Sequence, residues 1–70
     1  METIGERAAQ AIKRRVRYGR IKPECDRINI PVGVVYDWAN GVTNPSAYYL
    51  QQMALAGYDV HYILTGVKKQ

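Results

Sequence analysis

The sequence predicts an all-α fold of five short helices in one small domain. Seventy residues bury too little surface to support two hydrophobic cores, so a single domain is expected. Apolar residues recur at helical spacing, and no alternating segment is long enough to favour a strand. One cysteine and one histidine exclude an internal disulfide and a metal cage, so helix packing must supply the stability.

The first helix is expected from Ile4 to about Tyr18. Thr3-Ile4-Gly5-Glu6 fits a capping box, in which the threonine hydroxyl and the glutamate carboxylate each accept a hydrogen bond from an amide at the helix start. Gly19 is the residue expected to end this helix. The side expected to face the core carries Ile4, Ala8, Ala11, Ile12 and Val16.

A second helix should begin near Lys22, because Pro23 is tolerated in a first turn, where its missing N–H has no helical partner. Cys25 and Ile28 are its inward residues. Cys25 is interpreted as a small core residue rather than a nucleophile, since no base partner is implied. Asn29 follows and tolerates the left-handed backbone conformation that a sharp turn requires.

Pro31 opens a third helix from Val32 to about Ala39, which Asn40-Gly41 ends. Its inward side is expected to carry Val35, Trp38 and Ala39, and its outward side Val32, Gly33, Tyr36, Asp37 and Asn40. Gly33 disfavours a helix by up to about 1 kcal/mol relative to alanine. A close approach of another surface would explain it; a glycine tolerated without purpose is the alternative.

Two more helices complete the fold. Pro45-Ser46 predicts the start of a fourth helix, which Gly57 ends. Asp59 caps a last helix from Val60 to Thr65, which Gly66 stops. The inward side of the fourth helix is expected to carry Ala47, Leu50, Met53 and Ala54.

The charge is uneven along the chain, whose net value is +4. Residues 1–28 hold eight basic side chains against four acids, whereas residues 29–66 hold no lysine or arginine and only two acids, Asp37 and Asp59. The segment 13–22 contains six basic residues and no acid. Such a block favours a polyanion, either nucleic acid or an anionic membrane surface; a merely solvated basic helix is the alternative.

Two short helices joined by about three residues form the layout of a helix-turn-helix. Residues 21–41 resemble that unit in the phage Cro and CI-type (XRE-like) repressor family. Pro45 falls where that family starts its fourth helix, and the family's usual ending, an aromatic residue followed by Leu-Thr-Gly, stands here within residues 62–66. The resemblance covers nearly the whole chain and rests on Cys25, Asn29-Ile30, Val35, Trp38, Asn40-Gly41 and Tyr62-Ile63-Leu64-Thr65-Gly66.

The resemblance implies a compact lambda-repressor-like DNA-binding domain over residues 1–66, with a short basic tail at 67–70. It implies that the third helix enters the major groove of double-stranded DNA, usually as a symmetric homodimer on a two-fold operator. Carried over by position, the base-reading residues are Val32, Gly33, Val34, Tyr36 and Asp37. The phosphate-binding set on the same basis is Arg14, Arg20, Ile21, Lys22, Asn40, Thr43 and Asn44.

Two positions depart from the family pattern. The family commonly has Gln, Ser or Arg where this chain has Val32-Gly33-Val34, so direct hydrogen-bond readout is poor there. Valine methyls could instead contact thymine methyls, and Asp37 could accept from cytosine N4 or be a solvated acid that repels phosphate. The family often places a glutamate, paired with a first-helix arginine, where Ala39 stands here, which leaves Arg14 freer to meet phosphate.

The C-terminal part holds more tyrosines than helix packing requires. Tyrosine is favoured in interfaces because it buries area while keeping a polar tip, so the last two helices are predicted to form a homodimer surface. Tyrosines lying singly across the monomer surface are the alternative. His61 is interpreted as an ordinary surface or interface histidine, with a pH switch as the alternative. The predicted dimer residues are Tyr48, Tyr49, Tyr58 and Tyr62.

The leading functional hypothesis is a small Cro-like transcriptional repressor from a bacteriophage or prophage, acting in the bacterial cytoplasm by occluding a promoter. The alternative is an antitoxin or anti-regulator that turns the helix-turn-helix surface to a protein partner. An enzyme is not expected, because the sequence offers no acid–base pair, no nucleophile–base pair and no phosphate-cradling glycine loop. Neither a cofactor, a small-molecule ligand nor a membrane partner is expected, and no export segment or membrane span is visible.

Overall fold

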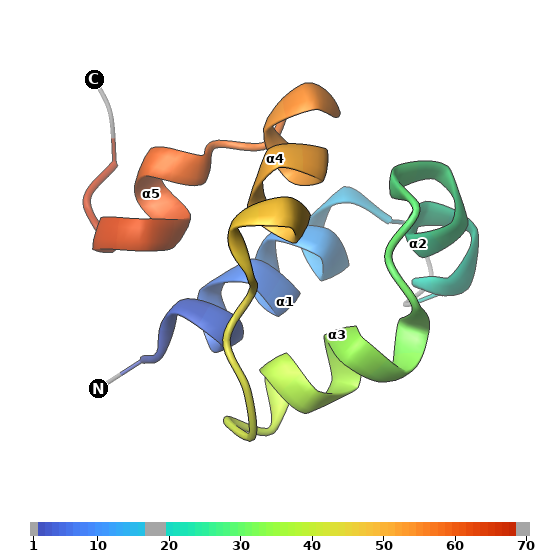
Figure 1. Ribbon diagram of the computed structural model, residues 1–70, viewed down its shortest axis with the longest axis horizontal. Helices are drawn as coiled ribbons and strands as arrows, with labels where there is room; N and C mark the ends of the chain where they lie inside the picture. Colours follow the sequence, from blue (N-terminus) through green and yellow to red (C-terminus); the bar gives the residue numbers. More distant parts are fainter. Residues whose placement is uncertain (1, 17–19, 69–70) are drawn as a thin grey trace.

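Five helices follow one another without a strand in the computed structural model, which describes residues 2–16 and 20–68 (Figure 1). The predicted all-α class and the order of the helices are therefore confirmed for the described residues. The helices are α1 (Ile4–Arg15), α2 (Lys22–Ile28), α3 (Val32–Ala39), α4 (Ala47–Leu55) and α5 (Val60–Thr65).

The predicted helix starts are confirmed by their caps. The Thr3 hydroxyl accepts from the Glu6 amide at 3.0 Å, and the Glu6 carboxylate accepts from the Thr3 amide at 2.8 Å, which completes the capping box. The Ser46 hydroxyl accepts from the amide of Tyr49 at the start of α4. At the start of α5 the Asp59 carboxylate accepts from the amide of Tyr62.

The end of α1 differs from the prediction, which carried the helix to Tyr18. The helix ends at Arg15, because Val16 already has an extended backbone, with φ −100° and ψ 146°. Tyr18 and the expected stop, Gly19, lie outside the described residues.

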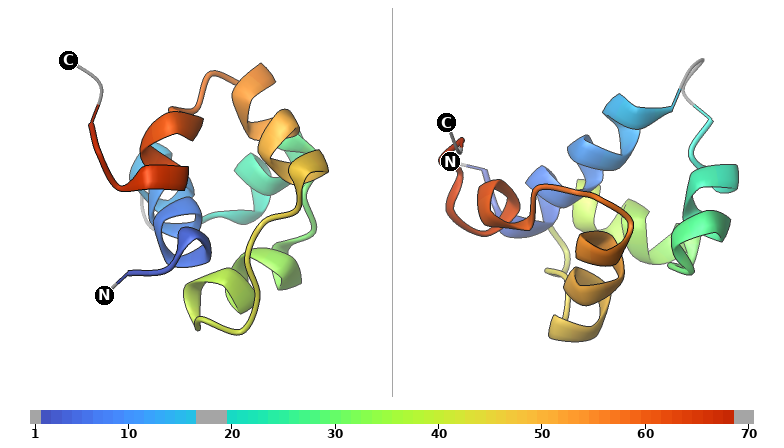
Figure 2. Two further views of the ribbon diagram at one scale, coloured as in Figure 1. Left: turned by 60° about the vertical axis from the view of Figure 1, so that its left-hand side comes forward. Right: turned by 90° about the horizontal axis from the view of Figure 1, so that it is seen from above.

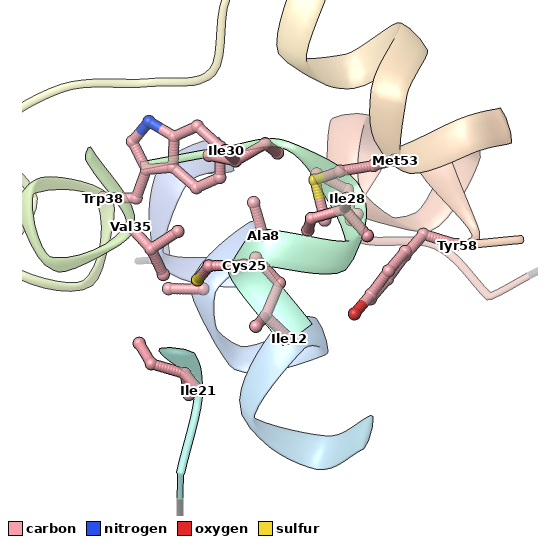
Figure 3. Close-up of a cluster of buried hydrophobic side chains, with 12 residues drawn as sticks. Ala8, Ile12, Ile21, Cys25, Ile28, Ile30, Val35, Trp38, Met53 and Tyr58 are labelled. Carbon is pink, nitrogen blue, oxygen red and sulfur yellow. The ribbon is translucent and has the colours of Figure 1, made fainter. Parts of the chain in front are cut away.

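Helix α1 forms the centre of the molecule and packs against α3 and α5. Figure 2 (right) shows α5 and α2 at opposite ends of α1. The core between the helices is continuous, and Figure 3 shows side chains from α1, α2, α3 and α4 meeting in it. The largest side chains with less than 2% exposure are Trp38, Ile12, Met53, Ile63, Val35 and Cys25, which confirms Cys25 as a core residue.

Gly5 lets the segment 41–46 cross closely over the start of α1. Its amide donates to the Asn44 side-chain oxygen at 2.9 Å. A Cβ at this position would clash with the Thr43 carbonyl oxygen and would lie 3.2 Å from the Trp38 Cα. This close contact ties the segment after α3 to α1, and so fixes the C-terminal end of α3.

Two arginines of α1 fasten the C-terminal helices to it. Arg7 donates through Nε to the Ile63 carbonyl at 2.8 Å and through a terminal nitrogen to that of Leu64. Arg15 donates to the carbonyls of Ala56 and Gly57 at 3.0 and 2.8 Å, just after α4. A cation at the carbonyl end of a helix is stabilised by the helix dipole and satisfies free carbonyls.

Candidate nucleic-acid interface

The turn between α2 and α3 is built from residues 29–31. Asn29 has φ 60° and ψ 44°, which confirms the predicted left-handed residue. The Ile30 amide donates to the Cys25 carbonyl at 3.0 Å, so the chain reverses tightly at the end of α2. Ile28 and Ile30 are 3% and 2% exposed, and their burial anchors the turn to the core. This turn fixes the direction in which α3 leaves α2 (Figure 1).

Helix α3 has one buried side and one open side. Val35 and Trp38 face the core, with 0% and 1% exposure, whereas Ala39 is half-buried. The predicted outward residues Gly33, Tyr36, Asp37 and Asn40 are all exposed. Val32, expected outward, and Val34 are instead half-buried and pack against the core. Of the five predicted base-reading residues, the structure therefore leaves only Gly33, Tyr36 and Asp37 fully on the open side.

Gly33 has no packing reason within the described residues. A Cβ built on it would meet nothing within 4 Å. The space around this exposed position in the first turn of α3 would therefore accommodate the side chain of alanine or of a larger residue. A Cβ at Gly5, by contrast, would meet backbone atoms, so packing explains the glycine at position 5 but not the one at position 33.

The open side of α3 is nearly uncharged, and its one charge is negative. Asp37 is exposed and has neither a hydrogen bond nor an ion pair to any described side chain. Tyr36 is 53% exposed, and its hydroxyl has no partner among the described residues. Positive charge near α3 must therefore come from other elements.

Two surface hollows that border α3 contain cations. One, which we call the Tyr36 hollow, joins the start of α2 to the middle of α3. The other, the Lys13 hollow, lies between α1 and the end of α3. The Tyr36 hollow is lined by Arg20, Ile21, Lys22, Pro23 and Tyr36. The Lys13 hollow is lined by Glu2, Glu6, Ala9, Gln10, Lys13 and Ala39.

The predicted phosphate-binding residues are not equally available. Arg14 is exposed, and among the described residues its guanidinium reaches only the Gln10 side chain, at 3.5 Å. Arg20 is exposed, and Lys22 is exposed but paired with Asp26 at 2.7 Å. The Ile21 side chain is buried at 5% exposure, so only its backbone could meet a phosphate.

The three polar residues after α3 in the predicted phosphate-binding set also differ in how available their side chains are. The side chains of Asn40 and Thr43 are exposed and have no hydrogen-bond partner among the described residues. The Asn44 side-chain oxygen already accepts from the Gly5 amide, so Asn44 has a structural role that the sequence did not reveal.

Some of the basic residues among the first 28 serve the fold rather than a partner. Arg7 and Arg15 bind helix-end carbonyls, and Arg27 forms a two-point pair with Glu24 at 2.8 and 2.7 Å. The Glu24 carboxylate also accepts from the Tyr58 hydroxyl, and Arg15 stacks 4.1 Å above the Tyr58 ring. The charge count alone therefore overstates the positive surface that is available.

Burial and these contacts shift the pKa values of Glu24, Tyr58 and Cys25. The Arg27 guanidinium, followed by the Tyr58 hydroxyl, lowers the pKa of Glu24 against an opposing effect of burial. Burial and the bond to Glu24 raise the pKa of Tyr58. Burial, followed by the neighbouring acids Asp26 and Glu24, raises the pKa of Cys25, which further disfavours a reactive thiolate.

The four tyrosines predicted to form a dimer surface lie in different environments. Tyr48 is 55% exposed and Tyr62 is half-buried on α5. Tyr49 is half-buried and makes an edge contact with Trp38 at 5.9 Å between ring centroids. Tyr58 is 8% exposed and bound to Glu24, so it is part of the monomer core rather than an accessible interface residue.

The described residues form neither a metal-ligand cluster nor a membrane-spanning helix. They contain no group of three or more histidine, cysteine, aspartate or glutamate side chains placed to hold a metal ion. None of the helices in this part of the chain has the length and apolarity needed to cross a bilayer. His61 is exposed on α5. Comparisons of the chain with protein-family models, with curated proteins and with solved structures gave no match.

Proposed function

We propose that this chain is a sequence-specific DNA-binding regulator of transcription that places α3 in the major groove. One observation carries the proposal. The α2–turn–α3 unit leaves the open side of α3 exposed, while Arg20, Lys22 and Lys13 line hollows on its borders. The flanking cations would bind phosphates and fix the position of the protein on the duplex, and α3 would read base edges.

The composition of the open side suits this division of roles. A neutral helix front avoids the cost of burying unpaired charge in the groove, and Gly33 would allow the helix backbone to come close to the bases. Asp37 would accept from cytosine N4, which makes it the candidate for base discrimination. The regulator we have in mind is a Cro-like repressor of a phage or prophage, which occludes a promoter by binding.

We further propose that it binds a two-fold operator as a homodimer. Three of the four tyrosines, Tyr48, Tyr49 and Tyr62, support this proposal because they keep accessible surface on α4 and α5. Sedimentation of the protein alone and on DNA tests the dimer. A monomer at high concentration in both states would rule it out.

The alternative function is a protein-interaction module, such as an antitoxin or anti-regulator. One observation favours it: the open side of α3 carries no basic residue and one unpaired acid. Val32→Arg separates the two functions, once circular dichroism has established that the variant is folded, because Val32 is half-buried against the core. An added cation at the helix start should strengthen duplex binding, whereas it should abolish binding to an apolar protein surface.

The experiment that tests the proposal is selection from a pool of random duplexes. Gel shifts of the selected duplex and a scrambled control at two salt concentrations would follow. We expect an inverted repeat with half-sites about one helical turn apart. Binding that depends on salt but not on sequence, or no binding, would contradict the proposal and favour the protein-interaction module.

A further inference from the structure

The Tyr36 hollow brings together groups that suit a phosphodiester. Arg20 and Lys22 supply two cations from the segment that begins α2, and Tyr36 supplies a hydroxyl from α3. Ile21 and Pro23 complete the lining with apolar atoms, and no acidic residue lines the hollow. A singly charged group with several acceptor oxygens fits these donors, because charged and neutral donors can bind different oxygens of one phosphate.

The Tyr36 hydroxyl is free to act as one of these donors. The side chain is 53% exposed, and the hydroxyl has no partner among the described residues. Tyr36 lines the same hollow as Arg20 and Lys22, whereas Gly33 and Asp37 do not line it. The geometry therefore places Tyr36 with the phosphate-binding residues, although the resemblance had assigned it to base reading.

Lys22 forms an exposed ion pair with Asp26, and a phosphate can take the place of Asp26. Its ammonium group contacts both carboxylate oxygens of Asp26, at 2.7 and 2.9 Å. The two side chains are 67% and 63% exposed, and an ion pair that open to water contributes little stability. Asp26 therefore competes with an incoming anion for Lys22 and weakens its binding.

Two other hollows that contain a basic residue, among those formed by the described residues, are less suitable. Glu2 and Glu6 line the Lys13 hollow and oppose an anion there. Arg27 lines a third hollow, between α2 and α4, but its guanidinium is already paired at two points with Glu24. The Tyr36 hollow is thus the better anion site of the three.

We propose that the Tyr36 hollow binds one phosphodiester group of the DNA backbone through Arg20, Lys22 and the Tyr36 hydroxyl, in competition with Asp26. This inference rests on the proposed function and deepens it. It assigns Tyr36 to the sequence-independent part of binding, and it identifies Asp26 as a residue whose removal improves affinity.

The first test removes only the hydroxyl. Tyr36→Phe should lower the affinity for the selected and the scrambled duplex by the same factor, about threefold to tenfold. The salt dependence should stay unchanged, because no charge is lost. A changed base preference, or no change in affinity, would overturn the assignment of Tyr36.

A phosphate scan locates the contact. Duplexes in which one phosphate at a time is replaced by an uncharged methylphosphonate are bound by the native protein and by Tyr36→Phe. When the equivalent phosphate of both half-sites is replaced, the effect of Tyr36→Phe should be much smaller at one such position than at the others, as a double-mutant cycle requires for two groups in contact. If the effect persists at every position, the hydroxyl does not bind the backbone.

The second test frees Lys22. Asp26→Asn should tighten duplex binding about twofold to fivefold beyond the control variant Asp59→Asn, in which asparagine can still cap α5, and should steepen the salt dependence by up to about one unit. Both variants remove one exposed negative charge, so their general electrostatic effects are matched. Equal affinities of the two variants would show that Asp26 does not compete at this site.

A titration with inorganic phosphate separates this inference from the proposed function. Nuclear magnetic resonance should show shifts of the Tyr36 and Lys22 side-chain signals, larger in Asp26→Asn. Such shifts without duplex binding would support the anion site and contradict DNA binding. Duplex binding without these shifts, in a protein whose affinity ignores Tyr36→Phe, would support DNA binding and overturn the anion site.

Discussion

Two helices of this protein have a glycine in their first turn, but the two glycines have different surroundings. Gly5 and Gly33 each occupy the second position of a helix, α1 and α3. Gly5 is buried beneath the segment 41–46, which leaves no room for a Cβ, whereas Gly33 is exposed and has nothing near it. The fold requires the first glycine. It does not require the second, so Gly33 is either a glycine tolerated without purpose or, as we propose, a point of close approach by DNA.

The same contrast separates two ion pairs on α2. The Glu24 side chain is 11% exposed and binds Arg27 and Tyr58, so it fixes α2 to the rest of the fold. Lys22 and Asp26 form an open pair on the surface. Sequence spacing alone makes both pairs look equivalent, yet one stabilises the structure and the other is available to a ligand.

The largest effect is expected at the start of α1. Gly5→Ala should lower the free energy of unfolding by about 3 kcal/mol, because its methyl group would displace the backbone at Thr43. Denaturant unfolding followed by circular dichroism measures this, with Gly33→Ala as the matched control. A variant as stable as the native protein would show that the segment 41–46 moves freely over α1.

The next effect concerns the inward pair on α2. Glu24→Gln should destabilise the fold by about 1 to 2 kcal/mol, because it weakens the bonds to Arg27 and Tyr58. The folded-state pKa of Glu24 is lowered, so its stabilisation is complete above the unfolded value of 4.5 and is lost as the pH falls through the folded value. Unfolding measured from pH 7 to pH 2 should therefore show a smaller acid-induced loss in Glu24→Gln. An unchanged pH profile would contradict this role.

Asn44 should have a smaller effect. Asn44→Ala leaves the partly buried Gly5 amide without its acceptor and should cost about 1 kcal/mol of stability. Asn40→Ala is the control, since that side chain is exposed and makes no hydrogen bond within the described residues. Thermal unfolding of the two variants compares them directly, and equal melting temperatures would remove the proposed link between segment 41–46 and α1.

The smallest change in stability should be a gain. Gly33→Ala should raise the free energy of unfolding by about 0.5 kcal/mol, because alanine favours a helix and has open space here. Denaturant unfolding checks this value. A loss of stability would mean that Gly33 has a packing role inside the protein.

Most of the fold could be predicted from local signals. The capping residues Thr3, Ser46 and Asp59 and the left-handed Asn29 act within a few residues of their own position, so their effects are readable in the sequence. The inward side of α3 followed from periodicity in the same way. The end of α1 was placed three residues too late, because its backbone becomes extended at Val16 without a local glycine or proline.

The position of the α2–turn–α3 unit could be predicted from the sequence. Which of the neighbouring side chains are already bound or buried within the protein could not. Which arginines already bind groups of the protein itself depends on contacts such as Arg7 with Ile63 and Arg15 with Gly57. The partners in these contacts are more than 40 residues apart. No local pattern encodes such contacts. The burial of Tyr58 and the role of Asn44 have the same long-range cause.

The affinity of Gly33→Ala for the selected duplex tests the central claim most directly. If the open side of α3 meets DNA closely at Gly33, the more stable variant should bind that duplex at least tenfold more weakly, while its binding to a scrambled duplex changes little. A variant that is more stable and binds the selected duplex as tightly as the native protein would contradict the assignment of α3 as the DNA-reading helix.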